Sequence, residues 1–142
     1  MPYARAVLIR APLERVWAAW KEPSWLAPRR RVEFRPGGAW EFFWGDDDAV
    51  DSTLGCTLLE LRPKRLLRFS WQGKGDFLHL FSEPGGRRTV IEVLLEAEEG
   101  AVRVTLAAPE GRPGKDWAAY EAWMSKAWEL ALDELRRTCE GR

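Results

Sequence analysis

The chain has 142 residues, of which 46% are hydrophobic and 31% charged, a balance typical of a folded domain rather than a disordered chain. Its 22 basic and 22 acidic residues cancel to a formal net charge of zero, which argues against a nucleic-acid-binding protein. No apolar run approaches membrane-spanning length, so membrane insertion is not expected either. The length fits one domain over residues 1–142. Cys56 and Cys139 match no metal-ligand spacing, which predicts free thiols and a cytoplasmic location.

The first part of the chain predicts one strand followed by two short helices. Residues 3–11 (YARAVLIRA) alternate as a strand does, and Pro12 then suits the first turn of a helix over residues 13–20. Pro23 breaks this helix, and residues 21–28 (KEPSWLAP) predict a second short helical turn. The basic run PRRR that follows is interpreted as a solvated turn.

From Val32 onward the hydrophobic period changes to two, which is typical of strands. Turn-forming sequences rich in Gly, Pro and Asp separate the expected strands, which occupy residues 32–34, 39–44, 53–61, 65–71, 89–97 and 101–107. The connection between the expected strands 65–71 and 89–97, residues 73–88, is long. Its segment FLHLF leaves two alternatives open, an extra strand or a flap.

Two joints fix which side chains share a face of the sheet. A two-residue turn at Glu99-Gly100 places Leu95 opposite Val104 and the charges of Glu96 and Arg103 opposite one another, with Val93 facing Leu106 and Ala97 facing Val102. Around Pro63-Lys64, the same reasoning assigns one face to Cys56, Leu58, Glu60, Leu67, Phe69 and Trp71.

Residues 115–140 form the strongest helical pattern in the chain. At 100° per residue, one broad apolar stripe forms along the helix, made of Trp117, Tyr120, Met124, Trp128, Ala131, Leu132 and Leu135. Trp123 and Leu130 lie outside this stripe, which predicts a contact with a sheet edge or with the second subunit of a homodimer. A long helix with so wide an apolar face needs a sheet to cover it.

These elements predict a two-layer α+β domain, with an antiparallel sheet curled around the long final helix. Trp40, Phe42 and Trp44 alternate on one strand and therefore share a face. We predict an apolar cavity between sheet and helix, lined by Trp40, Phe42, Trp44, Phe69, Trp71, Trp117, Tyr120 and Met124. The same rings could instead interlock as a solid core, and composition alone does not separate the two.

Five segments carry a resemblance to a known family. They are APLERVWAAWKEP, RPGGAWEF, LGCTLLELRPKRLLRFSW, VRVTL and AWELALDEL, which follow one another between residues 11 and 135. In this order they resemble the SRPBCC or START-like superfamily, which includes the birch-pollen-allergen-like proteins, and most closely its heat-shock chaperone ATPase activator homologue (AHSA) family. The resemblance implies a helix-grip fold around a pocket that binds hydrophobic small molecules such as lipids or polyketides.

Three functions are weighed against one another. The first is a non-catalytic protein that binds a hydrophobic or aromatic metabolite, with no cofactor and no metal. The second is an enzyme of the polyketide cyclase or dehydratase kind, which would need an acid–base group in the cavity; the candidates are Tyr120, Glu60 and the single histidine, His79. The third is a chaperone-interaction module. Because no catalytic or metal-ligating cluster is recognisable, we expect the first.

Overall fold

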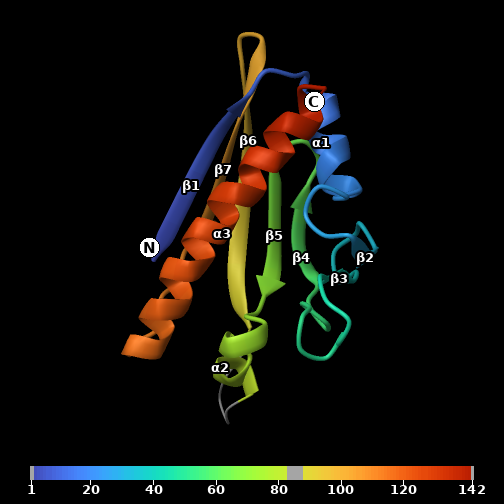
Figure 1. The fold of residues 1–142 in the computed structure, drawn as a ribbon. Helices are drawn as coiled ribbons and strands as arrows, with labels where there is room; N and C mark the ends of the chain where they lie inside the picture. The colour runs from blue at the N-terminus through green and yellow to red at the C-terminus, as the bar shows by residue number, and fades with distance from the viewer. Residues whose placement is uncertain (1, 83–87, 142) are drawn as a thin grey trace.

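A five-stranded antiparallel sheet and one long helix dominate the computed structural model, which describes residues 2–82 and 88–141 (Figure 1). The strand order is β1-β7-β6-β5-β4, and α3 (Lys115–Cys139) crosses the concave face of the sheet. The strands are β1 (Tyr3–Ile9), β4 (Leu58–Arg62), β5 (Leu66–Trp71), β6 (Thr89–Glu98) and β7 (Ala101–Ala108). This arrangement confirms the predicted α+β class, with a curved sheet around the C-terminal helix.

A second, two-stranded sheet is formed by β2 (Arg29–Val32) and β3 (Trp40–Phe43). The Trp40 N–H donates to the carbonyl of Cys56, two residues before β4 begins, at 2.9 Å and so connects the small sheet to the main one. The basic run at 29–31 is thus a strand, and its interpretation as a solvated turn was wrong. The strand could not be recognised from alternating buried and exposed residues, because Arg29, Arg30 and Arg31 are all exposed although their backbone pairs with β3.

The helix α1 (Leu13–Lys21) begins directly after Pro12, as the sequence predicted, and buries Val16, Trp17 and Trp20. The second short helix expected after Pro23 is reduced to one turn, which the Leu26 N–H closes on the Pro23 carbonyl at 3.1 Å. The turn positions Leu26 beside Trp44, the residue that follows β3.

The connection after β5 contains no extra strand in its described part. It forms a single turn of 3₁₀ helix (η1, Gly75–Phe77) and a short helix, α2 (His79–Ser82). Because Phe77 and Phe81 are four residues apart, their rings lie on one side of these turns and pack against Tyr120 of α3 at 5.5 and 5.3 Å between ring centroids. Residues 83–87 of this connection lie outside the described residues.

The predicted hairpin register is confirmed at all four pairs, including Leu95 with Val104 and Glu96 with Arg103. Gly100 closes the turn with a φ of 70°, a conformation that glycine adopts without steric cost. The guanidinium of Arg103 bonds diagonally to Glu98 at 2.7 Å, so the outer face still pairs opposite charges.

The predicted inward position of Glu60 was wrong. A register shift between Leu58 and Glu60 places Glu60 opposite Arg68, on the outer face of the sheet. There its carboxylate pairs with Arg68 at 3.2 Å and with Arg62 at 2.8 Å. The other residues assigned to the inner face around this joint are buried, namely Cys56, Leu58, Leu67, Phe69 and Trp71.

Candidate ligand-binding cleft

The eight aromatic and apolar residues predicted to line a cavity fall into three groups in the structure. Trp40, Phe42 and Phe69 form the first and are completely buried. Trp40 packs on Phe42 and Phe69 with ring centroids 5.0 and 5.1 Å apart. These three rings belong to the core beneath the sheet–helix junction and are not in the lining of the cleft beside α3.

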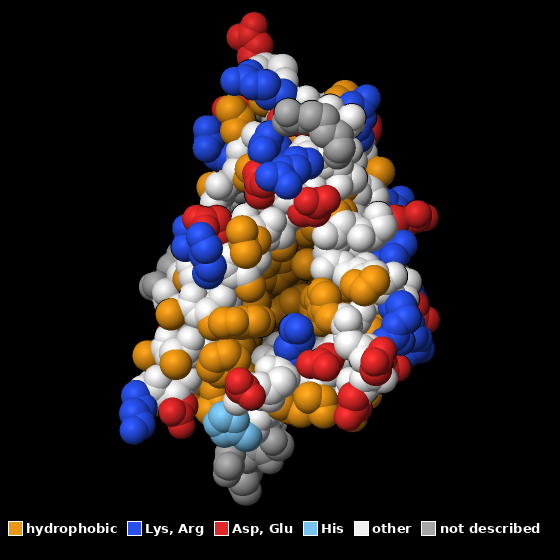
Figure 2. All heavy atoms as spheres, viewed as in Figure 1, with side chains coloured by type: hydrophobic (Ala, Val, Ile, Leu, Met, Phe, Trp, Pro, Cys, Tyr) orange, Lys and Arg blue, Asp and Glu red, His pale blue; other side chains and the backbone are white. Residues whose placement is uncertain are grey.

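The second group, Trp44, Trp71 and Met124, borders an apolar cleft of about 160 Å³ between α3 and the ends of β3 and β5. Figure 2 shows this hollow as a gathering of hydrophobic side chains beside the long helix. Its other lining residues are Leu26, Thr53, Gln72, Lys74, Trp123, Ala127, Trp128 and Ala131. A cavity of about 150 Å³ is enough to bind benzene, so the cleft matches a single aromatic ring.

The walls of the cleft are aromatic rings that brace one another. Trp71 lies 5.0 Å from Trp128 and 6.3 Å from Trp44 between ring centroids. Ala127 and Ala131, one turn apart on α3, complete the helix side. The space exists in part because these two side chains are small.

The third group, Trp117 and Tyr120, belongs to an aromatic cluster with Phe77 and Phe81. Phe81 lies 5.1 Å from Trp117, and the rings of Trp117 and Tyr120 are perpendicular at 5.7 Å. Gly73 permits this packing, because a Cβ at its position would lie 2.8 Å from the Cβ of Phe77 and 3.0 Å from the Tyr120 ring. The cluster closes one end of the sheet–helix junction and does not border the cleft.

Tyr120 is buried, and burial raises the pKa of its hydroxyl well above the ordinary value of 10.0. Among the described residues the hydroxyl has no hydrogen-bond partner, and the nearby Thr89 hydroxyl donates instead to the Trp71 carbonyl at 3.2 Å. A phenol so placed stays protonated at neutral pH and is poorly suited to serve as a general base.

We therefore predict that Tyr120→Phe changes the free energy of unfolding by less than about 1 kcal/mol, because no well-formed hydrogen bond is lost. Urea denaturation of both proteins measures the difference. Ligand affinity at the cleft should stay the same as well. A loss of more than about 2 kcal/mol would mean that the hydroxyl is a structural anchor.

The polar atoms of the cleft are mostly engaged with the protein itself. The Trp44 indole N–H donates to the Leu26 carbonyl at 2.9 Å, and the Thr53 hydroxyl oxygen accepts the Phe42 N–H at 3.0 Å. The Gln72 amide donates to the Ser52 carbonyl and accepts from Arg88 Nε at 3.0 Å. Lys74 is the one charged side chain of the lining. The surface that the cleft presents is therefore mostly apolar.

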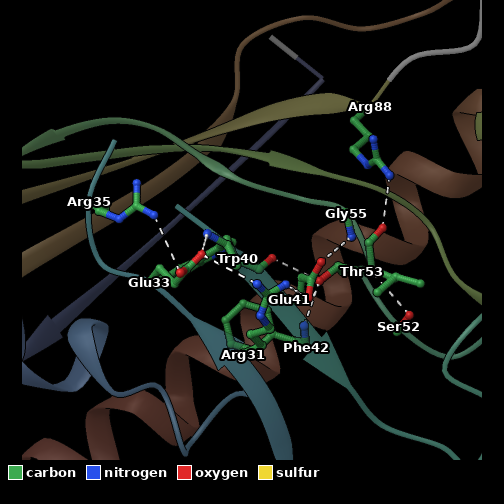
Figure 3. Close-up of polar contacts among 12 residues, drawn as sticks. Arg31, Glu33, Arg35, Trp40, Glu41, Phe42, Ser52, Thr53, Gly55 and Arg88 are labelled. Carbon is green, nitrogen blue, oxygen red and sulfur yellow. Dashed lines mark hydrogen bonds and ion pairs between the residues drawn. The ribbon is translucent and has the colours of Figure 1, made fainter. Parts of the chain in front are cut away.

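Glu41 lies outside the cleft, with its carboxylate buried on the side of β3 opposite Trp40 and Phe42 (Figure 3). The carboxylate accepts the Gly55 N–H at 2.8 Å and pairs with Arg31 at 3.4 Å. These contacts tie β3 to the loop that carries Thr53, so Glu41 helps to position the cleft wall without contacting it.

The remaining acid–base candidates are not brought together. Glu60 is on the outer face of the sheet, whereas His79 is exposed at the start of α2. Within residues 2–82 and 88–141, no group of three or more His, Cys, Asp or Glu side chains is arranged to hold a metal. Cys56 and Cys139 are free and buried, and burial raises the pKa of each thiol to about 11, which disfavours the nucleophilic thiolate.

Sequence reasoning missed the helix side of the cleft and its polar rim. Trp128 and Ala131 were recognised on the apolar stripe of α3 but were not among the residues predicted to line the cavity. Lys74 and Gln72 gave no signal, because they follow β5 in a connection whose path the pattern did not fix. The helical repeat of Trp123, Ala127 and Ala131 was the one available clue to a wall with small side chains.

The family model described as Activator of Hsp90 ATPase homolog 1-like protein matches residues 10–140. Among solved structures, the Aha1 dimer from Colwellia psychrerythraea superposes with a TM-score of 0.73 and 16% identity, over 97% of this chain and 95% of that one. CalU16 from Micromonospora echinospora superposes with a TM-score of 0.60 and 22% identity, over 93% and 71% of the two chains. DynU16, from the dynemicin biosynthetic locus, superposes with a TM-score of 0.67 and 21% identity, over 97% of this chain and 46% of that one.

At these identities, the solved structures establish a shared fold and nothing finer. No curated protein matches the sequence. In the described part of the chain, no helix is both long enough and apolar enough to cross a membrane.

Proposed function

The chain belongs to the family of Activator of Hsp90 ATPase homolog 1-like proteins, and from this premise we propose that it is a non-catalytic binder of small aromatic or hydrophobic molecules. The ligand site is the cleft between β5 and α3, and residues 1–142 act as one domain. The observation that carries the proposal is the makeup of the lining, in which aromatic and aliphatic walls surround a space of about 160 Å³. Concave apolar sites with few polar groups are typical of small-molecule binding.

Of the eight residues predicted from the sequence, we retain Trp44, Trp71 and Met124 as direct ligand contacts and add Trp128 from α3. Trp40, Phe42 and Phe69 support the site from the core, and Trp117 and Tyr120 belong to the separate aromatic cluster at the end of the sheet–helix junction. This division follows their burial and ring contacts. CalU16 and DynU16 share the fold, and the origin of DynU16 in a biosynthetic locus supports a small-molecule ligand for this chain.

A polyketide cyclase or dehydratase activity has less support. The cleft holds no carboxylate and no histidine in its lining, and its polar side chains are Thr53, Gln72 and Lys74. General acid–base chemistry needs a titratable group within hydrogen-bond reach of the reacting atom. Lys74 is the one titratable residue in that lining.

A homodimer and a cytoplasmic location remain predictions. The relative from Colwellia psychrerythraea is described as a dimer, and in this chain Leu130 on α3 is 61% exposed beside the edge strand β1. The AHSA-like chaperone-interaction role, by contrast, is supported by no surface feature of residues 2–82 and 88–141 that singles out a partner.

The test uses the small number of methionines. The sequence contains two, Met1 and Met124, so a protein labelled with ¹³C-methyl methionine has one methyl reporter inside the chain, at the wall of the cleft. Titration with toluene should shift the Met124 methyl resonance in a saturable way, and the Met124→Leu variant assigns the signal. No shift with toluene, or a shift that never saturates, would contradict the proposed function.

A further inference from the structure

Lys74 is the single charge in an otherwise neutral cleft. Of the eleven lining residues, ten are apolar or uncharged. The Lys74 ammonium lies 5.0 Å from the centre of the Trp44 ring, within the range of a cation–π contact. Because the Trp44 indole N–H is fixed by the Leu26 carbonyl at 2.9 Å, the ring that supports the ammonium is itself held in place. The positive charge is thus held at the wall of the cleft.

The ammonium of Lys74 has no carboxylate partner among the described residues. Lys64 and Lys126, by comparison, pair with Glu14 at 3.5 Å and with Glu129 at 2.6 Å. The guanidinium of Arg88 is occupied by the Gln72 side chain and by the Leu54 carbonyl. Lys74 is half-buried and faces aromatic rings, so its three N–H donors are the strongest unused donors at the cleft.

We propose that the ligand is a single-ring aromatic acid, with its ring between Trp71 and the helix wall and its anionic group on Lys74. This inference rests on the proposed function and names the chemical class of the ligand. A neutral aromatic molecule uses the walls alone, whereas a carboxylate adds a charge-assisted hydrogen bond with the ammonium. The volume of about 160 Å³ holds one ring, which leaves the acidic group at the rim beside Lys74.

The experiment compares 4-methylbenzoate with 4-methylbenzamide, which have the same shape and differ in charge. Both are titrated while the Met124 methyl resonance is followed. The acid should bind about tenfold more tightly than the amide to the unmodified protein, which corresponds to one charge-assisted hydrogen bond at the rim. Added salt should weaken the binding of the acid and leave that of the amide unchanged.

Three variants locate the source of this preference. Lys74→Met should reduce the ratio of the two affinities to about one, and Lys74→Arg should retain most of it, since each good charge-assisted contact is worth about tenfold. Lys115→Met removes an equal charge from an exposed position at the start of α3 and should leave the ratio unchanged. Thermal melts establish that each variant is folded.

The outcomes separate this inference from the proposed function. Saturable binding of the amide with no preference for the acid overturns the inference and leaves the binding function in place. A preference that survives in Lys74→Met also overturns it, because the charge then comes from elsewhere. If neither compound nor toluene shifts the Met124 signal, the cleft is no ligand site and both proposals fail.

Discussion

Replacing Trp40 with alanine is expected to lower the free energy of unfolding by about 3–5 kcal/mol, the range found for fully buried tryptophans. Trp40 is 0% exposed and contacts Phe34, Phe42 and Phe69, so the cavity left behind has rigid walls on several sides. Chemical denaturation measures the loss. The shift of the Met124 methyl resonance with toluene should saturate at nearly the same concentration as in the unmodified protein, because Trp40 does not line the cleft.

The matched control is Trp44→Ala, four residues further along the chain. Trp44 is only partly buried and borders the cleft, so the loss of stability should be smaller, about 1–2 kcal/mol. Toluene binding should weaken in this variant. Equal losses of stability in the two variants, or weakened binding in Trp40→Ala alone, would contradict the division of these rings between core and cleft.

The second large effect is expected from filling the cleft. In Ala131→Leu, the added side chain points from α3 into the space that the ligand would occupy. Toluene affinity should fall more than tenfold, which is about 1.4 kcal/mol or more of binding free energy. Stability should be unchanged or should rise by up to about 2 kcal/mol, as is common when a cavity is filled.

Ala122→Leu is the matched control, since it makes the same change at an exposed position of the same helix. It should leave toluene binding unaffected. If Ala131→Leu binds toluene as tightly as the unmodified protein, the ligand does not enter between Ala131 and the aromatic wall. If it instead unfolds the protein, the space is too tight to be a binding site.

Much of the fold could be predicted because two levels of pattern agree in this chain. In the β6–β7 hairpin, one register satisfies both the apolar pairs, such as Leu95 with Val104, and the charged outer face. The final helix is equally clear, because its apolar stripe repeats over 25 residues. Where a single periodicity fixes both the element and its buried face, the sequence is a sufficient guide.

The errors arose where the backbone departs from a regular period. The bulge before Glu60 turns one carboxylate outward, and no residue type marks its position. In β2, three consecutive arginines are exposed, so the strand is visible only through its pairing with β3. Residues 75–82 form helical turns because their phenylalanines pack on α3, a tertiary contact that local pattern does not contain.

The residues predicted to line a cavity differ in depth within the structure, which the sequence pattern could not indicate. Alternation placed Trp40, Phe42 and Trp44 on one face, yet depth within the molecule differs sharply along that face. Phe34 and Trp17 cover the end near Trp40, with ring centroids 5.3 Å apart, while Trp44 lies toward the open end. Periodicity gives the direction of a side chain, and only the assembled fold gives its distance from solvent.

The most direct test of the account is where a bound aromatic molecule lies. Intermolecular nuclear Overhauser effects should be recorded between toluene and the protein labelled at its methyl and indole groups. A ligand in the cleft should give contacts from toluene to the Met124 and Ala131 methyl groups and to the indole rings of Trp71 and Trp128. Contacts confined to the Trp117–Tyr120 cluster, or to the exposed Leu130 surface, would contradict a ligand site in the cleft.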